Sequence, residues 1–370
     1  MAIEAGSVFL APITAGGQDF FAVVDTGSSD TWLVSGDFTC VSPSDGTVQS
    51  QSDCYFGPAY DPTISSNYTM IQNQNFNITY ADGESLTGDM AFDTYTLGGI
   101  TVPNQEFGLV DYAAWYGDQY SSGLVGLCYS TLTSAYAGTD PHQDTYPISY
   151  PTIFDNMYNN QSVPPLFSLA ITRDPSDSGN GGVLALGGIP NVPHSPYFAS
   201  APIIPYGINR TSGALVYQYY TVDTEGFAIS KSQGTQFNLY STPNSKKTPL
   251  VGNGTNVIID SGTTLVYLPN DVATAITAAF TPPGAFDPDT SLTYVSCTAI
   301  PPVVGVSIGR KIFYINPVDM IAQVNNTACI SGVQPSMSGL SLLGDVWMKS
   351  VIAVFDIGAQ QMRFAAREFY

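Results

Sequence analysis

The sequence predicts an all-β protein built from two similar halves, and three observations support this fold class. Short runs of alternating apolar and polar residues, such as Phe76-Asn77-Ile78-Thr79-Tyr80, recur along the 370 residues between Gly, Pro, Asn and Asp. Helical signals are few, and the best are residues 151–160 and 269–280, each of which opens with Pro. The third observation is a short motif that occurs twice in the chain.

The two copies of this motif lie 235 residues apart, at 23–29 (Val-Val-Asp-Thr-Gly-Ser-Ser) and 258–264 (Ile-Ile-Asp-Ser-Gly-Thr-Thr). In each, an apolar strand end runs into Asp, a small hydroxyl residue and Gly, which marks a strand breaking into a tight turn. The turn leaves backbone N–H groups able to donate to the carboxylate. An apolar-Gly segment follows each copy, at 124–126 and 342–344. We therefore expect a duplicated unit, with Asp25 and Asp260 meeting across an internal two-fold axis.

Charge is strongly unbalanced, with ten Lys and Arg against thirty Asp and Glu and a net charge of −20. Eighteen of the acidic residues precede Arg173, which is the first basic residue. Without a basic surface to neutralise phosphates, nucleic-acid binding is excluded. Protonating a carboxylate that has no cationic partner costs the folded protein little stability. When they are ionised, such carboxylates repel one another. We expect stability in acid and loss of activity above neutral pH.

The double motif resembles the pepsin family of aspartic endopeptidases, most closely its secreted fungal branch. The resemblance runs nearly end to end and is carried also by residues 18–20, 80–88, 154–156, 167–169, 187–189, 344–346 and 354–356. It implies a bilobal fold of two pseudo-symmetric β-barrel-like lobes with a few short helices and a β-hairpin flap. The first lobe is expected at 1–187, with one catalytic Asp and the flap, and the second at 188–370.

The resemblance also implies the chemistry, in which Asp25 and Asp260 hydrolyse peptide bonds. Two carboxylates about 3 Å apart repel by about 5–6 kcal/mol at an effective dielectric near 20, so the pair keeps one proton over a broad acid range. The ionised member takes a proton from a bound water, and the protonated member donates to the scissile carbonyl. The mechanism needs no covalent intermediate, cofactor or metal.

Supporting and substrate-binding roles follow by the same resemblance. Residues expected to hold the two turns are Thr26, Gly27, Ser28, Trp32, Ser261, Gly262 and Thr263. Residues expected to contact substrate are Tyr80, Asp82, Gly83, Trp115, Leu124, Tyr219 and Thr264. Tyr80, Trp115 and Leu124 would wall the primary pocket, which favours apolar or aromatic side chains around the scissile bond. For Trp115 and Tyr219 simple packing is the alternative.

The flap sequence departs from the family pattern in two places. Ala81 stands where Gly is usual, and the tip is one residue longer, with Glu84 as the extra residue. Asp82 resembles an acidic flap residue that lets some fungal relatives accept Lys before the cleaved bond. We expect Trp32 to contact the Tyr80 hydroxyl.

The resemblance further implies an extracellular protein made as a zymogen. Its lobe-internal disulfides correspond to Cys40–Cys54 and Cys297–Cys329, which leaves Cys128 as a buried free thiol. Six Asn-x-Ser/Thr sites are candidates for glycosylation: Asn67, Asn77, Asn160, Asn209, Asn253 and Asn325. We expect a secreted monomer that binds pepstatin-type inhibitors, with no membrane span and with Met1 close to the mature start.

Other functions account for the sequence less well. A non-catalytic binding or inhibitory protein on the same scaffold would usually lack an Asp or the flap Tyr, and here Asp25, Asp260 and Tyr80 are all present. His142 and His194 lie in no metal-binding or Ser-His-Asp motif, and no loop has calcium-ligand spacing. A glycan-bearing wall protein would explain neither Asp turn.

Overall fold

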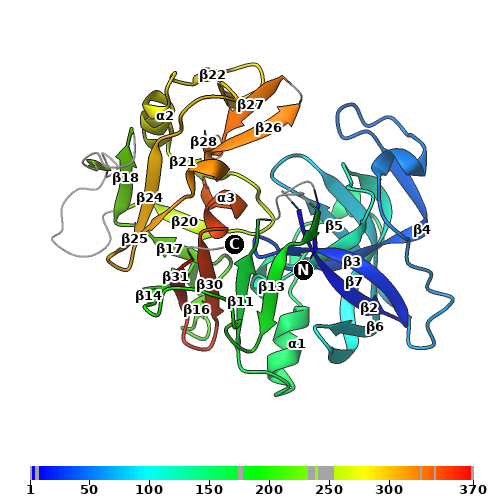
Figure 1. Cartoon of the computed structure of the whole chain (residues 1–370). Coiled ribbons are helices and arrows are strands. Elements are labelled where there is room, and N and C mark those ends of the chain that lie inside the picture. The colour runs from blue at the N-terminus through cyan, green and yellow to red at the C-terminus, as the bar shows by residue number, and fades with distance from the viewer. Residues whose placement is uncertain are drawn as a thin grey trace. The chain divides into compact units, whose positions relative to one another are not determined.

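The computed structural model describes residues 2–4, 8–173, 178–231, 238–240, 254–325, 327–336 and 339–367 (Figure 1). Its contacts divide the chain into two compact units. The first unit comprises residues 1–165, 175–187 and 206–219, and the second comprises 166–174, 188–205 and 220–370. The chain therefore passes between the two units several times between residues 165 and 220, whereas the sequence predicts a single boundary after residue 187.

The first unit is built around one large sheet, which confirms the all-β prediction for this part of the chain. The sheet has the strand order β10-β9-β5-β6-β7-β4-β8-β3-β2-β1-β12. The strands of the unit are β1 (Ala2–Glu4), β2 (Val8–Ala15), β3 (Gln18–Asp25), β4 (Thr31–Val41), β5 (Thr69–Thr79), β6 (Ser85–Leu97), β7 (Ile100–Ala114), β8 (Ser121–Gly126), β9 (Ala135–Ala137), β10 (Pro147–Ile148), β12 (Ser178–Asn180), β13 (Gly182–Leu186), β15 (Gly207–Ile208) and β16 (Leu215–Val216).

The second unit is also mostly β but consists of several smaller sheets. One has the order β17-β20-β29-β21-β28, and others contain β11-β30-β31-β14, β19-β18-β24-β25 and β22-β23-β27-β26. The strands are β11 (Leu166–Ile171), β14 (Ala199–Pro202), β17 (Thr221–Asp223), β18 (Gly226–Ser230), β19 (Asn238–Tyr240), β20 (Asn256–Ile259), β21 (Val266–Leu268), β22 (Ala285–Asp287), β23 (Leu292–Val295), β24 (Val303–Ile308), β25 (Lys311–Tyr314), β26 (Ile321–Asn325), β27 (Ala328–Ser331), β28 (Val333–Pro335), β29 (Ser341–Leu343), β30 (Val351–Asp356) and β31 (Gln361–Ala366).

Five strands of each unit repeat one another in order and direction. In the first unit they are β2-β3-β8-β4-β7, and in the second β17-β20-β29-β21-β28. In both sets the first pair is antiparallel, the second parallel, the third antiparallel and the fourth parallel. The repeat seen in the sequence is thus also a repeat of topology, and it places the two Asp turns at equivalent strand ends.

The helices are few and short. They are α1 (Ile153–Asn159), α2 (Asn270–Ala279) and α3 (Asp345–Met348), with 3₁₀ turns at Gln51–Cys54, Ser130–Leu132, Pro141–Gln143 and Pro317–Met320. Thr152 and Asp155 form a capping box at the start of α1, so Pro151 precedes the helix. Pro269 is the N-cap of α2, whose buried face includes Val272 and Ile276. Both helices predicted from the sequence are confirmed, whereas α3 was not predicted.

Each unit has its own buried aromatic cluster. In the first, Trp32, Phe76 and Trp115 belong to one core cluster. In the second, Phe167 stacks on Phe355 with ring centroids 4.5 Å apart. Burial of several such side chains, each contributing about 1.5–3 kcal/mol, stabilises the sheets that carry the turns.

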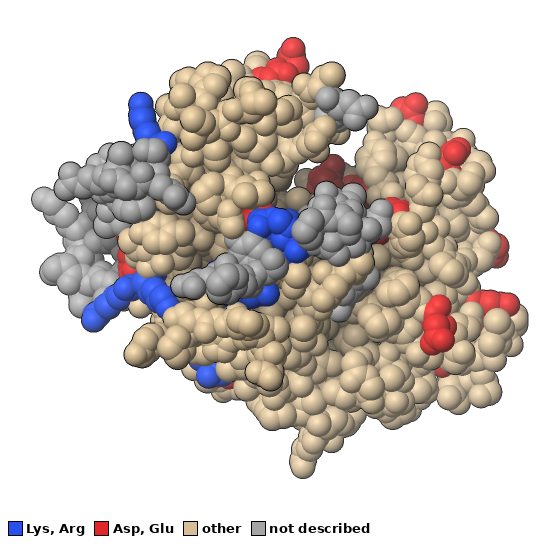
Figure 2. Space-filling model, in the orientation of Figure 1, with Lys and Arg blue, Asp and Glu red and all other residues tan. Residues whose placement is uncertain are grey.

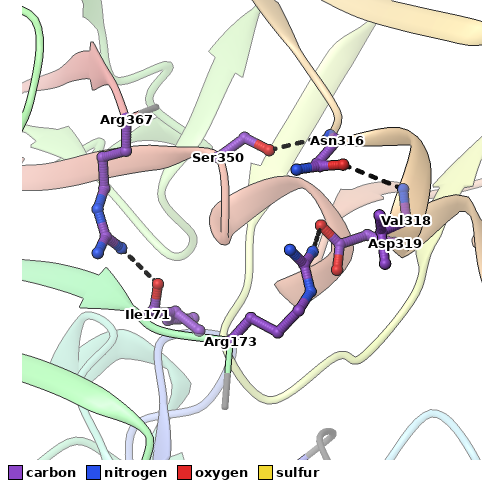
Figure 3. A network of polar contacts seen from close by, with 7 residues as sticks. All are labelled: Ile171, Arg173, Asn316, Val318, Asp319, Ser350 and Arg367. Carbon is purple, nitrogen blue, oxygen red and sulfur yellow. Dashed lines mark hydrogen bonds and ion pairs between the residues drawn. The ribbon is translucent and has the colours of Figure 1, made fainter. Parts of the chain in front are cut away.

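Two arginine side chains of the second unit bind partners within that unit (Figure 3). Arg173 forms an ion pair with Asp319, and Arg367 donates to the carbonyl of Ile171. Arg367 and Asp319 are both buried. On the face drawn in Figure 2, blue atoms gather over the C-terminal elements, while the N-terminal elements show red and tan.

Candidate active site

The first Asp turn begins where β3 ends, at Asp25. The backbone N–H of Gly27 donates to Asp25 Oδ1 over 2.7 Å, and the Ser28 hydroxyl donates to Oδ2. The carboxylate is only 5% exposed, so these donors replace water that burial removes. Asp25 also pairs with Gly126 in the neighbouring parallel strand β8. The turn therefore presents a fixed carboxylate whose two oxygens both accept hydrogen bonds.

The second Asp turn repeats this arrangement one residue beyond β20. Gly262 N–H donates to Asp260 Oδ1 over 2.9 Å, and the Thr263 hydroxyl donates to Oδ2 over 2.6 Å. Asp260 is 9% exposed, and its N–H donates to the carbonyl of Leu343 in β29 over 3.2 Å. Ser28 and Thr263 thus contact the carboxylate oxygens that the resemblance implies for them.

A close backbone approach supports each turn from the apolar-Gly segment. A Cβ on Gly126 would lie 2.4 Å from the carbonyl carbon of Ser29, and one on Gly344 would lie 2.1 Å from the carbonyl oxygen of Thr263. Only glycine fits at either position. The N–H of Asp345 and that of Val346 then donate to the carbonyls of Thr263 and Thr264. This explains why each Asp motif is matched by an apolar-Gly segment.

The predicted flap is a β-hairpin formed by β5 and β6. Its turn is closed by Tyr80 N–H donating to the Glu84 carbonyl over 2.8 Å, and Gly83 adopts a φ of 96°. Asp82 is exposed and accepts from Glu84 N–H. Trp32 Nε1–H donates to the Tyr80 hydroxyl over 2.9 Å, the contact expected from the sequence. Burial and the nearby charge of Asp25 raise the pKa of Tyr80, so its hydroxyl stays protonated.

The proposed pocket residues of the first unit lie together around Trp32. Trp32 and Leu124 are register partners in β4 and β8, and the Trp115 ring lies 5.2 Å from Trp32 and 5.7 Å from Tyr80. Trp115 is also stacked on Phe56 and is only 9% exposed, so it packs in the core of the first unit. Tyr219 is partly buried, in the segment 206–219.

Asp30 is a feature of the first turn that the sequence reading missed. Its side chain is fully buried, and Oδ1 accepts from Ser134 N–H over 2.9 Å and from the Tyr150 hydroxyl over 2.6 Å. Burial, only partly offset by these hydrogen bonds, raises the pKa of Asp30 to about 6. Asp30 lies five residues after Asp25, which is visible in the sequence. Its burial was not predictable, because its partners Ser134 and Tyr150 lie more than a hundred residues away in the chain.

The cysteines form two disulfides, Cys40–Cys54 and Cys297–Cys329, one in each unit. Cys128 is a buried free thiol. Its Sγ donates to the carbonyl of Gln218 over 2.7 Å, which joins the segment 206–219 to the strand end beside the first turn. Cys128 therefore packs and donates a hydrogen bond.

The glycosylation candidates differ in how their amides are used. Asn77 donates to the carbonyl of Pro141 and to Asp144, whereas exposed Asn209 uses its amide oxygen to accept from its own turn. Asn67 and Asn160 are exposed. Asn253 lies outside the described residues, as does the side chain of Asn325. All six stay predictions.

Comparison with known proteins points to the same protein family as the two Asp turns. A sequence model of the eukaryotic aspartyl protease family matches residues 9–367. The chain belongs to this family. A probable aspartic-type endopeptidase of Aspergillus fumigatus is 40% identical over 370 residues, covering 98% of this chain and 79% of the relative. Rhizopuspepsin-2 of Rhizopus niveus is 26% identical over 345 residues, covering 92% of this chain and 73% of the relative.

A solved structure extends the likeness to the fold. The aspartic proteinase of Irpex lacteus superimposes with a TM-score of 0.69 over 100% of this chain and 98% of that chain, at 20% identity. The predicted pepsin-like fold is confirmed, and so is the enzyme class: the protease is a hydrolase of proteins or peptides. Among the described residues, none of the helices is both long and apolar enough to span a bilayer.

Proposed function

We propose that the protease is a secreted endopeptidase that cleaves proteins in acid with Asp25 and Asp260 as a proton-sharing pair. The observation that carries the proposal is the matched turn geometry, in which each buried carboxylate accepts a backbone N–H on one oxygen and a hydroxyl on the other. Such donors fix the orientation of each carboxylate without adding a titrating group. Asp25 and Asp260 are therefore held in equivalent positions, and either could carry the shared proton.

The proposed chemistry requires that the carboxyl groups of Asp25 and Asp260 share one proton. When one proton is shared, the ionised member accepts a proton from a water as that water attacks the scissile carbonyl, and the protonated member donates to the carbonyl oxygen. As the amine leaves, it receives a proton from one member of the pair, and a hydroxyl of the tetrahedral intermediate returns a proton to the other member, so the pair again holds one shared proton. Thr26 and Ser261 would lock the two turns together, and Gly27 and Gly262 would let substrate backbone approach.

Substrate preference follows from the residues around Trp32. Tyr80, Trp115 and Leu124 belong to one apolar and aromatic cluster, so we infer a preference for apolar or aromatic side chains around the scissile bond. Gly83, Thr264 and Tyr219 are further candidates for substrate contact. Asp82 is exposed at the flap tip, where a Lys side chain of the substrate could pair with it. We infer a monomer that works outside the cell and binds pepstatin-type inhibitors.

Hydrolysis of denatured globin tests the proposal. We expect cleavage at pH 3–4 that pepstatin abolishes and that falls at least 10³-fold in Asp25→Asn and Asp260→Asn, since neither variant can share a proton. A matched control is Asp37→Asn, a carboxylate outside both turns, which should retain activity. Cleavage that survives both pepstatin and Asp25→Asn would overturn the mechanism. Correct folding without any cleavage would favour a binding protein on the same scaffold.

A further inference from the structure

The flap tip carries a contact that its turn alone does not require. Glu84, the extra residue of the flap, accepts a hydrogen bond on Oε1 from the backbone N–H of Tyr116 over 2.6 Å. Glu84 directly precedes β6, and Tyr116 follows the end of β7 by two residues. Ser85 and Ala114 are the terminal pair of the β6–β7 ladder. The Glu84 side chain therefore extends the ladder past the point where backbone pairing stops.

The segment that receives this contact is itself anchored. Gly117 N–H donates to the carbonyl of Cys54 over 3.1 Å, and Gln119 N–H donates to that of Tyr55 over 2.6 Å. Cys54 is in turn joined to Cys40 of β4 by a disulfide. Hydrogen bonds to residues 54 and 55 thus restrain the movement of residues 116–119, and the hydrogen bond from Tyr116 ties the flap tip to this anchored segment.

The same contact closes a ring of interactions around the flap tyrosine. Tyr80 contacts Trp32 through its hydroxyl and lies against the Trp115 ring, and Trp115 directly precedes Tyr116. Tyr80 N–H donates to the Glu84 carbonyl, so one residue holds both the turn and the support. Loss of the Glu84 side chain would leave the turn intact but release it from the Trp115 segment.

We propose that Glu84 is a positioning residue that latches the flap tip to the Tyr116 segment and so holds Tyr80 in its binding-ready position before substrate arrives. This proposal rests on the proposed function, because it assigns Glu84 a role in substrate capture. A flap that is already ordered loses less conformational entropy when substrate binds. The latch therefore lowers KM and leaves the chemical step at the Asp pair nearly unchanged.

The chemistry of the latch suits an acid-acting protease. Burial and the nearby Asp82 raise the pKa of Glu84 to about 8, so the carboxyl group is neutral throughout the acid range. Its carbonyl oxygen still accepts from Tyr116 N–H. A glutamine side chain offers the same carbonyl oxygen at the same length, whereas alanine offers none.

Hydrogen exchange and kinetics test the latch together. In Glu84→Ala we expect faster exchange of peptides spanning 80–85 and 114–119, and a KM that rises about 2- to 10-fold with kcat nearly unchanged, as for loss of one hydrogen bond. Glu84→Gln should restore both values at pH 4. Glu106→Ala removes a partly buried Glu from β7, away from the flap tip, and should change neither.

The outcomes separate the latch from the proposed function. Unchanged exchange in Glu84→Ala, or an exchange rate in Glu84→Gln equal to that of Glu84→Ala, would overturn the latch. Because exchange can be measured in an Asp25→Asn background, this result does not depend on activity. A wild-type protein that fails to cleave any substrate would instead count against the proposed function and leave the exchange comparison as the test of the contact.

Discussion

The first unit carries nineteen acidic residues and one arginine, whereas the second carries eleven acidic residues and nine basic ones. The two units nevertheless surround Asp25 and Asp260 with the same two hydrogen bonds. The geometry of the turn is therefore independent of the charge of the unit that holds it. Backbone donors and hydroxyl groups fix the carboxylates, and these donors do not titrate in acid.

The charge difference appears instead in how each unit responds to pH. Burial raises the pKa of five acids in the first unit: Asp30, Glu84, Asp89, Glu106 and Asp111. In the second unit burial raises the pKa of Asp223. In the second unit Asp319 and Asp356 have arginine partners. We infer that the first unit is the one that acid stabilises most.

Removing the ion pair between buried Asp319 and partly buried Arg173 should produce the largest difference between the units. Asp319→Asn removes one buried carboxylate from beside Arg173, and we expect a loss of about 3 kcal/mol in the free energy of unfolding of the second unit. The matched control is Asp356→Asn, whose partner Arg363 is more exposed and which should cost about 1 kcal/mol or less. Urea unfolding at pH 5 measures both, and equal losses would contradict the assignment.

A pH series should isolate the contribution of Asp30. Its pKa is raised to about 6 in the folded protein, so the stabilisation by its protonated form is complete below pH 3.8 and is lost as pH rises through 6. About two pKa units for a fully buried group amount to about 3 kcal/mol. Asp30→Asn cannot titrate, so its stability should fall less between pH 4 and 7. Parallel curves for the two proteins would show that Asp30 is not responsible.

Removing the disulfide of each unit should reveal a smaller difference in stability between the units. Cys40 and Cys54 are 14 residues apart, and Cys297 and Cys329 are 32 apart, so the second disulfide closes the longer loop. The chain-entropy argument gives about 3 kcal/mol for the shorter loop and about 0.7 kcal/mol more for the longer one. Paired Cys→Ser variants, measured by thermal unfolding, should rank in that order. The reverse order would indicate that native contacts outweigh loop length.

The smallest expected difference between the units is in the effect of equivalent substitutions in the two Asp turns on kcat. Ser28→Ala and Thr263→Ala each remove one hydroxyl donor from a carboxylate, which is worth about 1.5–3 kcal/mol, so each should lower kcat about 10- to 100-fold. Because the geometry is repeated, we expect the two losses to agree within a factor of about three. Steady-state kinetics on one peptide at pH 4 measures them. A loss confined to one variant would show that the two carboxylates are not held alike.

The sequence by itself determined the features that depend on near neighbours along the chain. A β-branched run followed by Asp, a hydroxyl residue and Gly can only leave the strand in a tight turn, so both Asp turns were visible without coordinates. The strand alternation and the helix near residues 151–160 were visible for the same reason. The family resemblance then supplied the pairing of the cysteines and the flap.

Only the tertiary structure decided the contacts between distant segments. Asp30 meets Ser134 and Tyr150, Glu84 meets Tyr116, and the segment 206–219 joins the first unit partly through Cys128. None of these partners is within thirty residues along the chain. A carboxyl group's pKa depends on burial and on what lies against it, so the composition could give the total charge but could not show where acid stabilises the protein.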